Sequence, residues 1–219
     1  MSGRTVLVTA FEPFGGETVN ASWEAARSID GFRCSEAAAV AVRLPCVYDA
    51  CVAEFVEAFE LLRPEAVLMT GQAAPRAIVS VERFARLRAG SAAPDNRGVG
   101  FRAASGRGRA ALRATASAAE VARAIRAAGL AARVSNDAGG YVCNHLYYGA
   151  LTHLRERAPA TPAVFVHLPA TPQQSPRRAS RRRLATPDAA RALEAAIRAM
   201  TASPLPEREC GSPSDFMLS

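Results

Sequence analysis

The sequence contains no lysine, and all 27 of its basic residues are arginine. It also has no apolar run long enough to span a bilayer, and its start lacks the charged and then apolar pattern of a secretion signal. Five cysteines are present, but their spacing fits neither a zinc site nor a disulfide framework. These absences predict a cytoplasmic protein with free thiols, no membrane partner and no bound metal.

The arginines give a formal net charge of +7, which raises the question of nucleic-acid binding. Most of them are scattered over predicted helices, and arginine and alanine are both abundant, as in a general compositional bias. The one dense cluster, between Arg177 and Arg183, lies in a segment without the interleaved aromatic residues or the recognition helix of nucleic-acid modules. We therefore expect no nucleic-acid partner.

Apolar runs of strand length alternate with segments of helical spacing along the chain. This alternation predicts an α/β fold with a mostly parallel central sheet and helices on both faces. The expected strands cover residues 5–10, 37–44, 66–70, 77–88, 131–135 and 163–167, and the expected helices cover 22–28, 47–62, 117–128, 146–154 and 187–200. We expect one domain over residues 1–203, a long surface loop over 90–108 and a frayed tail over 204–219.

One segment joins a strand end, a glycine-containing turn and a helix start, and it carries a cysteine. Cys143 falls near the first turn of that helix, where unpaired backbone N–H groups and the helix dipole favour a thiolate. The same N–H groups can hold the oxyanion that forms when sulfur attacks an amide carbonyl. Cys143 is therefore a candidate nucleophile.

A nucleophilic thiol needs a base, and histidine suits this role because its pKa lies near neutrality. His145 and His153 follow Cys143 on the same helix, and His145 should point away from the sulfur, at roughly 200° around the helix axis. His167 ends a buried strand at the sheet edge where Cys143 should emerge. Glu82, in an otherwise apolar alternating strand, either orients the imidazole or faces outward on an edge strand. The residue pattern leaves the roles of His167 and Glu82 open.

Four blocks of the sequence resemble the pyroglutamyl peptidase I family, also called pyrrolidone-carboxylate peptidases. They are VLVTAFEPFGGE (6–17) with NASWEA (20–25), GQA (71–73) with VER (81–83), SNDAGGYVCNHLYYG (135–149), and FVHLP (165–169) with PQQ (172–174). The blocks occur in the family's order and spacing across nearly the whole chain, and the first and third are highly specific together. The resemblance implies a three-layer α/β/α sandwich, no cofactor or metal, and often a homotetramer.

By position, the resemblance assigns the nucleophile, base and orienting acid of the family to Cys143, His167 and Glu82. The implied reaction is the removal of an N-terminal pyroglutamyl (5-oxoproline) residue from a peptide by a cysteine exopeptidase. The reaction passes through a thioester acyl-enzyme.

The resemblance also implies a pocket for the flat, uncharged lactam ring, with Phe11 and Phe14 covering its two faces. Tyr141 and Val142 could form another wall, and Gln72 could meet the polar edge of the lactam or the neighbouring backbone. A free glutamine or glutamate terminus would bring a charge into this apolar slot and lose its hydration without a partner. Without the resemblance, core packing is the better explanation of the two phenylalanines.

The chain departs from the family pattern mainly between Ala74 and Leu112. Ala74-Pro75 stands where the family has two glycines, Ala92 aligns with an arginine that lies near the site, and Leu112 replaces an aromatic residue. These changes leave the three residues assigned to catalysis intact. They bear on the catalytic efficiency and on the range of peptides that the protein can cleave. The alternative hypothesis is a low-activity relative that binds pyroglutamyl-like peptide ends, or that hydrolyses another small cyclic amide.

Overall fold

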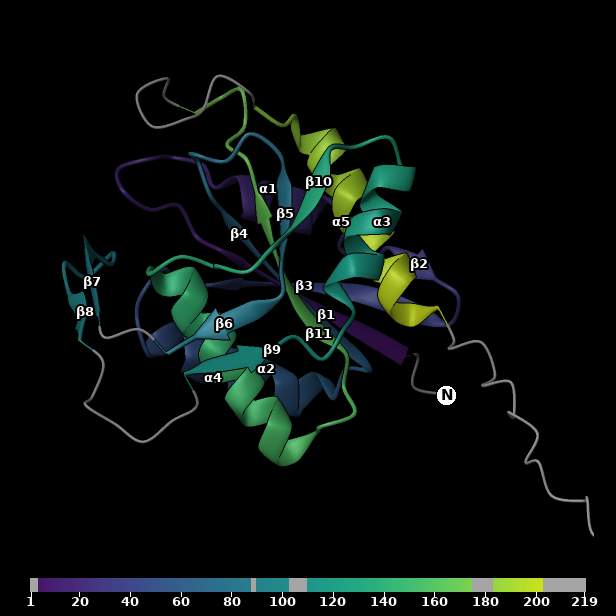
Figure 1. Cartoon of the computed structure of the whole chain (residues 1–219), viewed down its shortest axis with the longest axis horizontal. Helices are drawn as coiled ribbons and strands as arrows, with labels where there is room; N and C mark the ends of the chain where they lie inside the picture. Colours follow the sequence, from purple (N-terminus) through teal and green to yellow (C-terminus); the bar gives the residue numbers. More distant parts are fainter. Residues whose placement is uncertain (1–3, 88–89, 103–109, 175–182, 203–219) are drawn as a thin grey trace, which may run out of the picture.

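A seven-stranded sheet with the strand order β10-β5-β11-β4-β1-β3-β2 forms the centre of the computed structural model (Figure 1). The structure describes residues 4–87, 90–102, 110–174 and 183–202, so the expected tail over 204–219 lies outside the described residues. The strands of this sheet are β1 (Arg4–Phe11), β2 (Arg33–Cys34), β3 (Ala37–Leu44), β4 (Ala66–Gln72), β5 (Val79–Glu82), β10 (Ala132–Ser135) and β11 (Ala163–Leu168).

Helices cover both faces of the sheet, which confirms the α/β sandwich (Figure 1). They are α1 (Ala21–Ser28), α2 (Ala50–Leu62), α3 (Ala118–Ala127), α4 (Val142–Arg157) and α5 (Thr186–Thr201). On one face α5 packs against both α1 and α3, and on the other α2 packs against α4. Among the described residues, no helix combines the length and the apolar character needed to cross a bilayer.

The central strands are buried because their sequences are almost continuously apolar. Every residue of β4 and of β11 is buried, as is β1 from Val6 onward. Such strands must be covered on both faces. A strand with one face open to solvent would instead carry a polar side chain at every second position. The apolar runs that predict these three strands therefore also predict their central place in the sheet.

The sheet is only mostly parallel, because β5 and β10 run against the central strands and the edge strand β2 runs antiparallel to β3. β1 pairs in parallel with β3 and β4, and β4 with β11, but β5 runs antiparallel to β11 and β10 follows β5. Residues 73–78, between β4 and β5, are too few for the crossover of about a dozen residues that a parallel return needs. The reversal of β5 places Glu82 opposite Phe165, in the middle of β11.

Two segments differ from the sequence-based expectation. The strand expected over 77–88 divides at Arg83 into β5 and β6 (Phe84–Arg86), and β6 pairs with β9 (Ala111–Arg113) in a separate sheet. At Arg83 the backbone changes partner: its N–H donates to Ser135 O at 2.7 Å, and its carbonyl accepts from Ala114 N at 2.9 Å. The alternation of apolar and polar residues breaks at the same point, because Glu82 and Arg83 are both polar and Phe84 and Ala85 are both apolar.

The loop expected over 90–108 contains a hairpin of β7 (Gly90–Pro94) and β8 (Gly100–Arg102), whereas residues 103–109 lie outside the described residues. Its turn is closed by Asp95, whose Oδ1 accepts from the backbone N–H groups of Arg97 and Val99 at 2.8 and 3.0 Å. Gly98 has φ +78°, a conformation that glycine adopts without strain. The turn is an aspartate side-chain turn of the kind that Asp and Gly favour.

Candidate active site

The end of β4, the end of β11 and the start of α4 meet at a cavity of about 380 Å³. The side chains that line it include Phe14, Gln72, Arg76, Tyr141, Cys143 and His167. Cys143 and His167 come from segments far apart in the sequence, and the fold brings both to one cavity. Glu82 lies directly behind His167.

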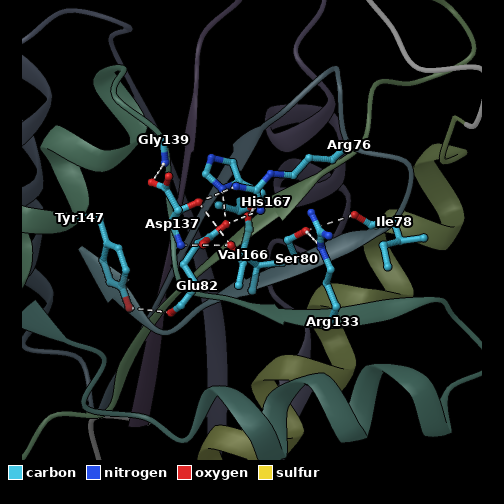
Figure 2. Close-up of polar contacts among 12 residues, drawn as sticks. Arg76, Ile78, Ser80, Glu82, Arg133, Asp137, Gly139, Tyr147, Val166 and His167 are labelled. Carbon is cyan, nitrogen blue, oxygen red and sulfur yellow. Dashed lines mark hydrogen bonds and ion pairs between the residues drawn. The ribbon is translucent and has the colours of Figure 1, made fainter. Parts of the chain in front are cut away.

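The Glu82 carboxylate and the His167 imidazole form a buried hydrogen-bonded pair (Figure 2). Glu82 Oε1 lies 2.8 Å from His167 Nδ1, and the two side chains are 0% and 3% exposed. Strand register explains the pairing: Phe165 lies opposite Glu82 and His167 opposite Ser80, so Glu82 and His167 are diagonal neighbours on one face. The Glu82 side chain therefore faces inward, not outward from an edge strand.

The pair determines which nitrogen of the imidazole carries the proton. A carboxylate only accepts hydrogen bonds, so Nδ1 donates to Glu82 and Nε2 is left as the acceptor. Burial is the largest influence on the pKa of His167 and lowers it, while the hydrogen bond and charge of Glu82 act in the opposite direction. The ring is therefore neutral at neutral pH and able to accept a proton at Nε2.

Cys143 lies in the first turn of α4 and is 8% exposed. Burial raises the pKa of its thiol well above the ordinary value, and it outweighs the backbone hydrogen bond and the Arg76 charge, which lower that pKa. The helix start alone therefore does not produce the expected thiolate, because desolvation disfavours the charged form more strongly. The thiol needs a base, and His167 lines the same cavity.

Gly71, near the end of β4, packs against the sulfur of Cys143. A Cβ atom placed on Gly71 would lie 2.9 Å from Cys143 Sγ and 2.9 Å from Phe165 Cζ. Real Cβ atoms do not approach so closely, so any larger residue here would displace the sulfur or the Phe165 ring. A glycine at this strand end therefore makes room for the thiol.

Changing Gly71 to alanine should lower turnover about tenfold to a hundredfold, because even a displacement of about 1 Å in a reacting group has effects of this size. The measurement is kcat on the substrate that the sequence resemblance implies, a pyroglutamyl amide. Gly149→Ala is the matched control, since its Cβ would collide with Val52 Cγ1 at 2.7 Å, between α4 and α2. Equal losses of kcat per folded molecule in the two variants would contradict a specific role for Gly71.

The structure separates the residues that were expected to surround a lactam ring. Phe14 and Tyr141 line the cavity with ring centroids 5.7 Å apart, whereas Phe11 and Val142 are 1% and 0% exposed and are not among the lining residues. Gln72 lines the cavity, but its Oε1 accepts from the backbone N–H of Ala21 at 2.7 Å and so supports the start of α1. Phe14 and Tyr141, rather than Phe11 and Phe14, face each other.

The β7–β8 hairpin holds this pocket wall through its turn. Tyr141 OH donates to Pro94 O at 3.1 Å, and Asn96 Nδ2 donates to Glu12 Oε1 at 2.8 Å and to Pro13 O at 2.9 Å. The hairpin therefore fixes both the loop that carries Phe14 and the ring of Tyr141. Sequence reasoning placed this segment in a surface loop and missed these contacts, because they join residues about 50 to 80 positions apart.

The other two histidines pair with acids outside the cavity. His145 Nε2 lies 2.9 Å from Asp49 Oδ1, and His153 Nε2 lies 3.1 Å from Glu60 Oε1. Within the described ranges, no three His, Cys, Asp or Glu side chains gather into a metal-ligand set. Of the arginine cluster between Arg177 and Arg183, only Arg183 belongs to the described residues.

Arg76 is a further site residue that the sequence analysis did not identify. Its Nη1 donates to Glu82 Oε1 at 2.5 Å, and its Nη2 donates to the carbonyl of Asp137 at 2.8 Å (Figure 2). Arg76 is one of 27 arginines in the chain, and nothing in its local sequence singled it out. An inward carboxylate such as Glu82 does, however, call for a cation nearby.

Comparison with known proteins adds independent information. The family described as "Pyroglutamyl peptidase" matches residues 4–203. A pyrrolidone-carboxylate peptidase of Cupriavidus necator is 39% identical over 212 residues, which cover 95% of this chain and 98% of that protein. Another, of Gloeobacter violaceus, is 41% identical over 175 residues, or 78% of this chain and 84% of that protein.

Solved structures give the same result. The pyroglutamyl peptidase I of Bacillus amyloliquefaciens superimposes with a TM-score of 0.86 at 32% identity, covering 90% of this chain and 95% of that chain. The pyrrolidone carboxyl peptidase of Thermococcus litoralis gives a TM-score of 0.84 at 26% identity, with 90% and 93% covered.

Proposed function

Given that the chain belongs to the pyroglutamyl peptidase family, we propose that Cys143, His167 and Glu82 are its catalytic residues. The chain is a hydrolase that removes N-terminal pyroglutamyl residues from peptides. The observation that carries the assignment is the buried Glu82–His167 hydrogen bond behind a cavity that His167 shares with Cys143.

In the first half of the reaction, His167 Nε2 takes the proton of the Cys143 thiol as the sulfur attacks the carbonyl carbon of the pyroglutamyl residue. Negative charge develops on the carbonyl oxygen, and backbone N–H groups at the start of α4 are suited to hold it. The imidazolium, stabilised by Glu82, then gives its proton to the leaving amine. The C–N bond breaks, and a pyroglutamyl thioester remains on Cys143.

In the second half, His167 takes a proton from a water molecule, whose oxygen attacks the thioester carbonyl. The C–S bond breaks, the imidazolium returns its proton to the sulfur, and free pyroglutamate leaves. Neither half of the reaction uses a cofactor or a metal. Glu82 holds the imidazole in one tautomer throughout both halves.

The pocket walls favour a small uncharged ring. Phe14 and Tyr141 offer aromatic surface, and we propose that the lactam lies against them, with Gln72 at its polar edge and with Phe11 and Val142 supporting the walls from the core. A protonated amino terminus would lose hydration on these aromatic walls, and a site without a partner for it discriminates strongly.

The remaining properties belong to the same proposal. We place the catalytic domain at residues 1–203, in the cytoplasm, where a nucleophilic thiol stays reduced. In support, Cys34, Cys46, Cys51 and Cys143 are all free thiols. A homotetramer follows from the family resemblance, and sedimentation would test it. We propose a pyroglutamyl peptide as the only class of partner besides further copies of the chain, with neither nucleic acid nor membrane among its partners.

The test of the proposed function is hydrolysis of a fluorogenic pyroglutamyl amide by the purified protein. We expect turnover with pyroglutamyl and none with the corresponding glutaminyl amide. Calorimetric binding of a pyroglutamyl peptide without any cleavage would instead favour the low-activity binder, and the outcome bears on Ala74 and Pro75, which line the cavity.

Alkylation of Cys143 should inactivate the protein, and a saturating pyroglutamyl compound should slow that reaction at least about tenfold by occupying the cavity. Mass mapping after partial iodoacetamide treatment measures the modification of each thiol. Cys46 is the internal control, because it does not line the cavity and a bound pyroglutamyl compound should not change its rate of modification. Full modification of Cys143 with activity retained would refute the assignment.

A further inference from the structure

Arg76 occupies a central place in the hydrogen bonding of the site, although it lies in neither β4 nor β5. Its side chain is 16% exposed and lines the cavity. The Glu82 Oε1 atom that receives Arg76 Nη1 at 2.5 Å is the same atom that lies 2.8 Å from His167 Nδ1. One carboxylate oxygen therefore joins the arginine and the base (Figure 2).

The other end of the guanidinium reaches the turn that leads to the nucleophile. Arg76 Nη2 donates to Asp137 O at 2.8 Å, and Asp137 Oδ1 accepts from the backbone N–H of Gly139 at 2.9 Å. This turn runs directly into α4, where Cys143 lies in the first turn. Arg76 thus links the turn before the nucleophile to the acid behind the base.

The Glu82 carboxylate needs this cation because it has no contact with water. Its side chain is 0% exposed, and within the described part of the chain its Oε2 has no hydrogen-bond partner. A buried carboxylate without an opposing charge is strongly unfavourable. Arg76 supplies that charge without using His167 as the counter-ion, so the imidazole need not be protonated.

The charged and titratable groups around His167 act in opposite directions. Glu82 from β5 and Asp137 from the turn raise the pKa of His167, and Arg76 lowers it. Arg76 also lowers the pKa of Cys143, the group that faces the cavity from α4. Removing Arg76 would leave two acids pulling a proton onto the imidazole, and a protonated imidazole cannot take the thiol proton.

We propose that Arg76 is a positioning residue of this active site: its guanidinium fixes Glu82 and the turn at Asp137, and so keeps His167 in its proton-accepting form opposite Cys143. The proposal rests on the proposed function for its kinetic consequences. Its structural core, the effect of Arg76 on the protonation of His167, can be measured without any substrate.

The experiment compares Arg76→Gln and Arg76→Lys with the unaltered chain. The pH midpoint of His167 is read from ¹⁵N-histidine NMR spectra, with a His167→Gln spectrum assigning the resonance, and kcat and KM are measured against pH. The matched control is Arg133→Gln, which removes a cation that donates to Ser80 Oγ on β5 at 3.4 Å but does not contact Glu82.

In Arg76→Gln we expect a higher His167 midpoint. Activity is lost as pH falls through the pKa of the base, so a raised pKa moves the acid limb of kcat/KM to higher pH. At neutral pH kcat should fall at least about tenfold with KM within about twofold. Arg76→Lys should restore the midpoint in part but not kcat, because an ammonium group lacks the planar fork that makes both bonds. Arg133→Gln should match the unaltered chain.

An unchanged or lower His167 midpoint in folded Arg76→Gln, or full kcat in Arg76→Lys, would overturn the proposal. Circular dichroism checks the fold, and if Arg76→Gln does not fold, the kcat of Arg76→Lys decides. If the unaltered chain had no peptidase activity, the proposed function would be refuted. The NMR midpoints of His167 would still test the role of Arg76, so the two failures are distinguishable.

Discussion

Cys143→Ala should abolish the release of pyroglutamate, lowering kcat by at least about a thousandfold. The remaining groups can still bind the lactam and polarise its carbonyl, but no thioester can form without the sulfur. The variant should therefore bind a pyroglutamyl peptide with nearly unchanged affinity, as measured by calorimetry. The expected pattern is loss of chemistry with retention of binding.

Cys34→Ala provides the matched control for this prediction. Cys34 and Cys143 are both 8% exposed, so the two substitutions remove equally buried sulfur atoms. Cys34 lies on the edge strand β2 and accepts a hydrogen bond from Thr201 Oγ1. It is not one of the residues that line the cavity. Its loss should leave kcat unchanged. A Cys143→Ala protein that keeps more than about a tenth of the turnover would show that another group is the nucleophile.

Glu82→Gln should lower kcat about a hundredfold to ten-thousandfold, with a much smaller change in KM. A glutamine amide that points its NH₂ group at Nδ1 places the imidazole proton on Nε2, which then faces the thiol as a donor instead of an acceptor. A glutamine that accepts from Nδ1 keeps the tautomer but loses the charge that stabilises the imidazolium. Both outcomes impair proton transfer without emptying the pocket.

Glu60→Gln tests the same chemical change at a site without catalytic function. Glu60 pairs with His153 as Glu82 pairs with His167, but its side chain is 53% exposed and the pair lies outside the cavity. Thermal unfolding of both variants separates stability from kinetics, since Glu82→Gln also removes the partner charge of Arg76. A change confined to KM in Glu82→Gln would count against the orienting role.

The sequence predicted the frame of the molecule because its strongest signals are local. The apolar runs gave β1, β4 and β11 with ends that shift by no more than two residues. The family resemblance was confirmed by the matches to known proteins. The same local signals did not give the direction of β5, although the short link before it excludes a parallel return.

The site was predicted less completely, since side-chain direction after a strand depends on the path of the loop. Phe11 and Phe14 are close in sequence, yet Phe11 still belongs to β1 and points into the core, whereas Phe14 has left the strand and lines the cavity. Burial of Cys143 likewise acts against the thiolate expected from its helix position, because it raises the pKa of the thiol. Helix position is visible in the sequence, but the degree of burial is not.

Arg76 and Gly71 were missed because their roles exist only in three dimensions. Gly71 matters through its approach to Cys143, 72 positions later, and Arg76 through an oxygen that it shares with His167. Gly71 belongs to the GQA block of the resemblance, but neither its contact with the sulfur nor the role of Arg76 is visible in the local sequence. Buried acids are the exception: an inward Glu82 predicts that some cation or donor must meet it.

The most direct test of the central claim is a crystal structure of the protein with a pyroglutamyl aldehyde, which a catalytic thiol attacks to form a stable hemithioacetal. We predict a covalent bond between Cys143 Sγ and the aldehyde carbon, the lactam ring against Phe14 and Tyr141, and His167 Nε2 within hydrogen-bond distance of the sulfur or the new hydroxyl. An adduct on another thiol, or an unmodified Cys143 whose sulfur lies out of reach of the His167 ring, would contradict the account.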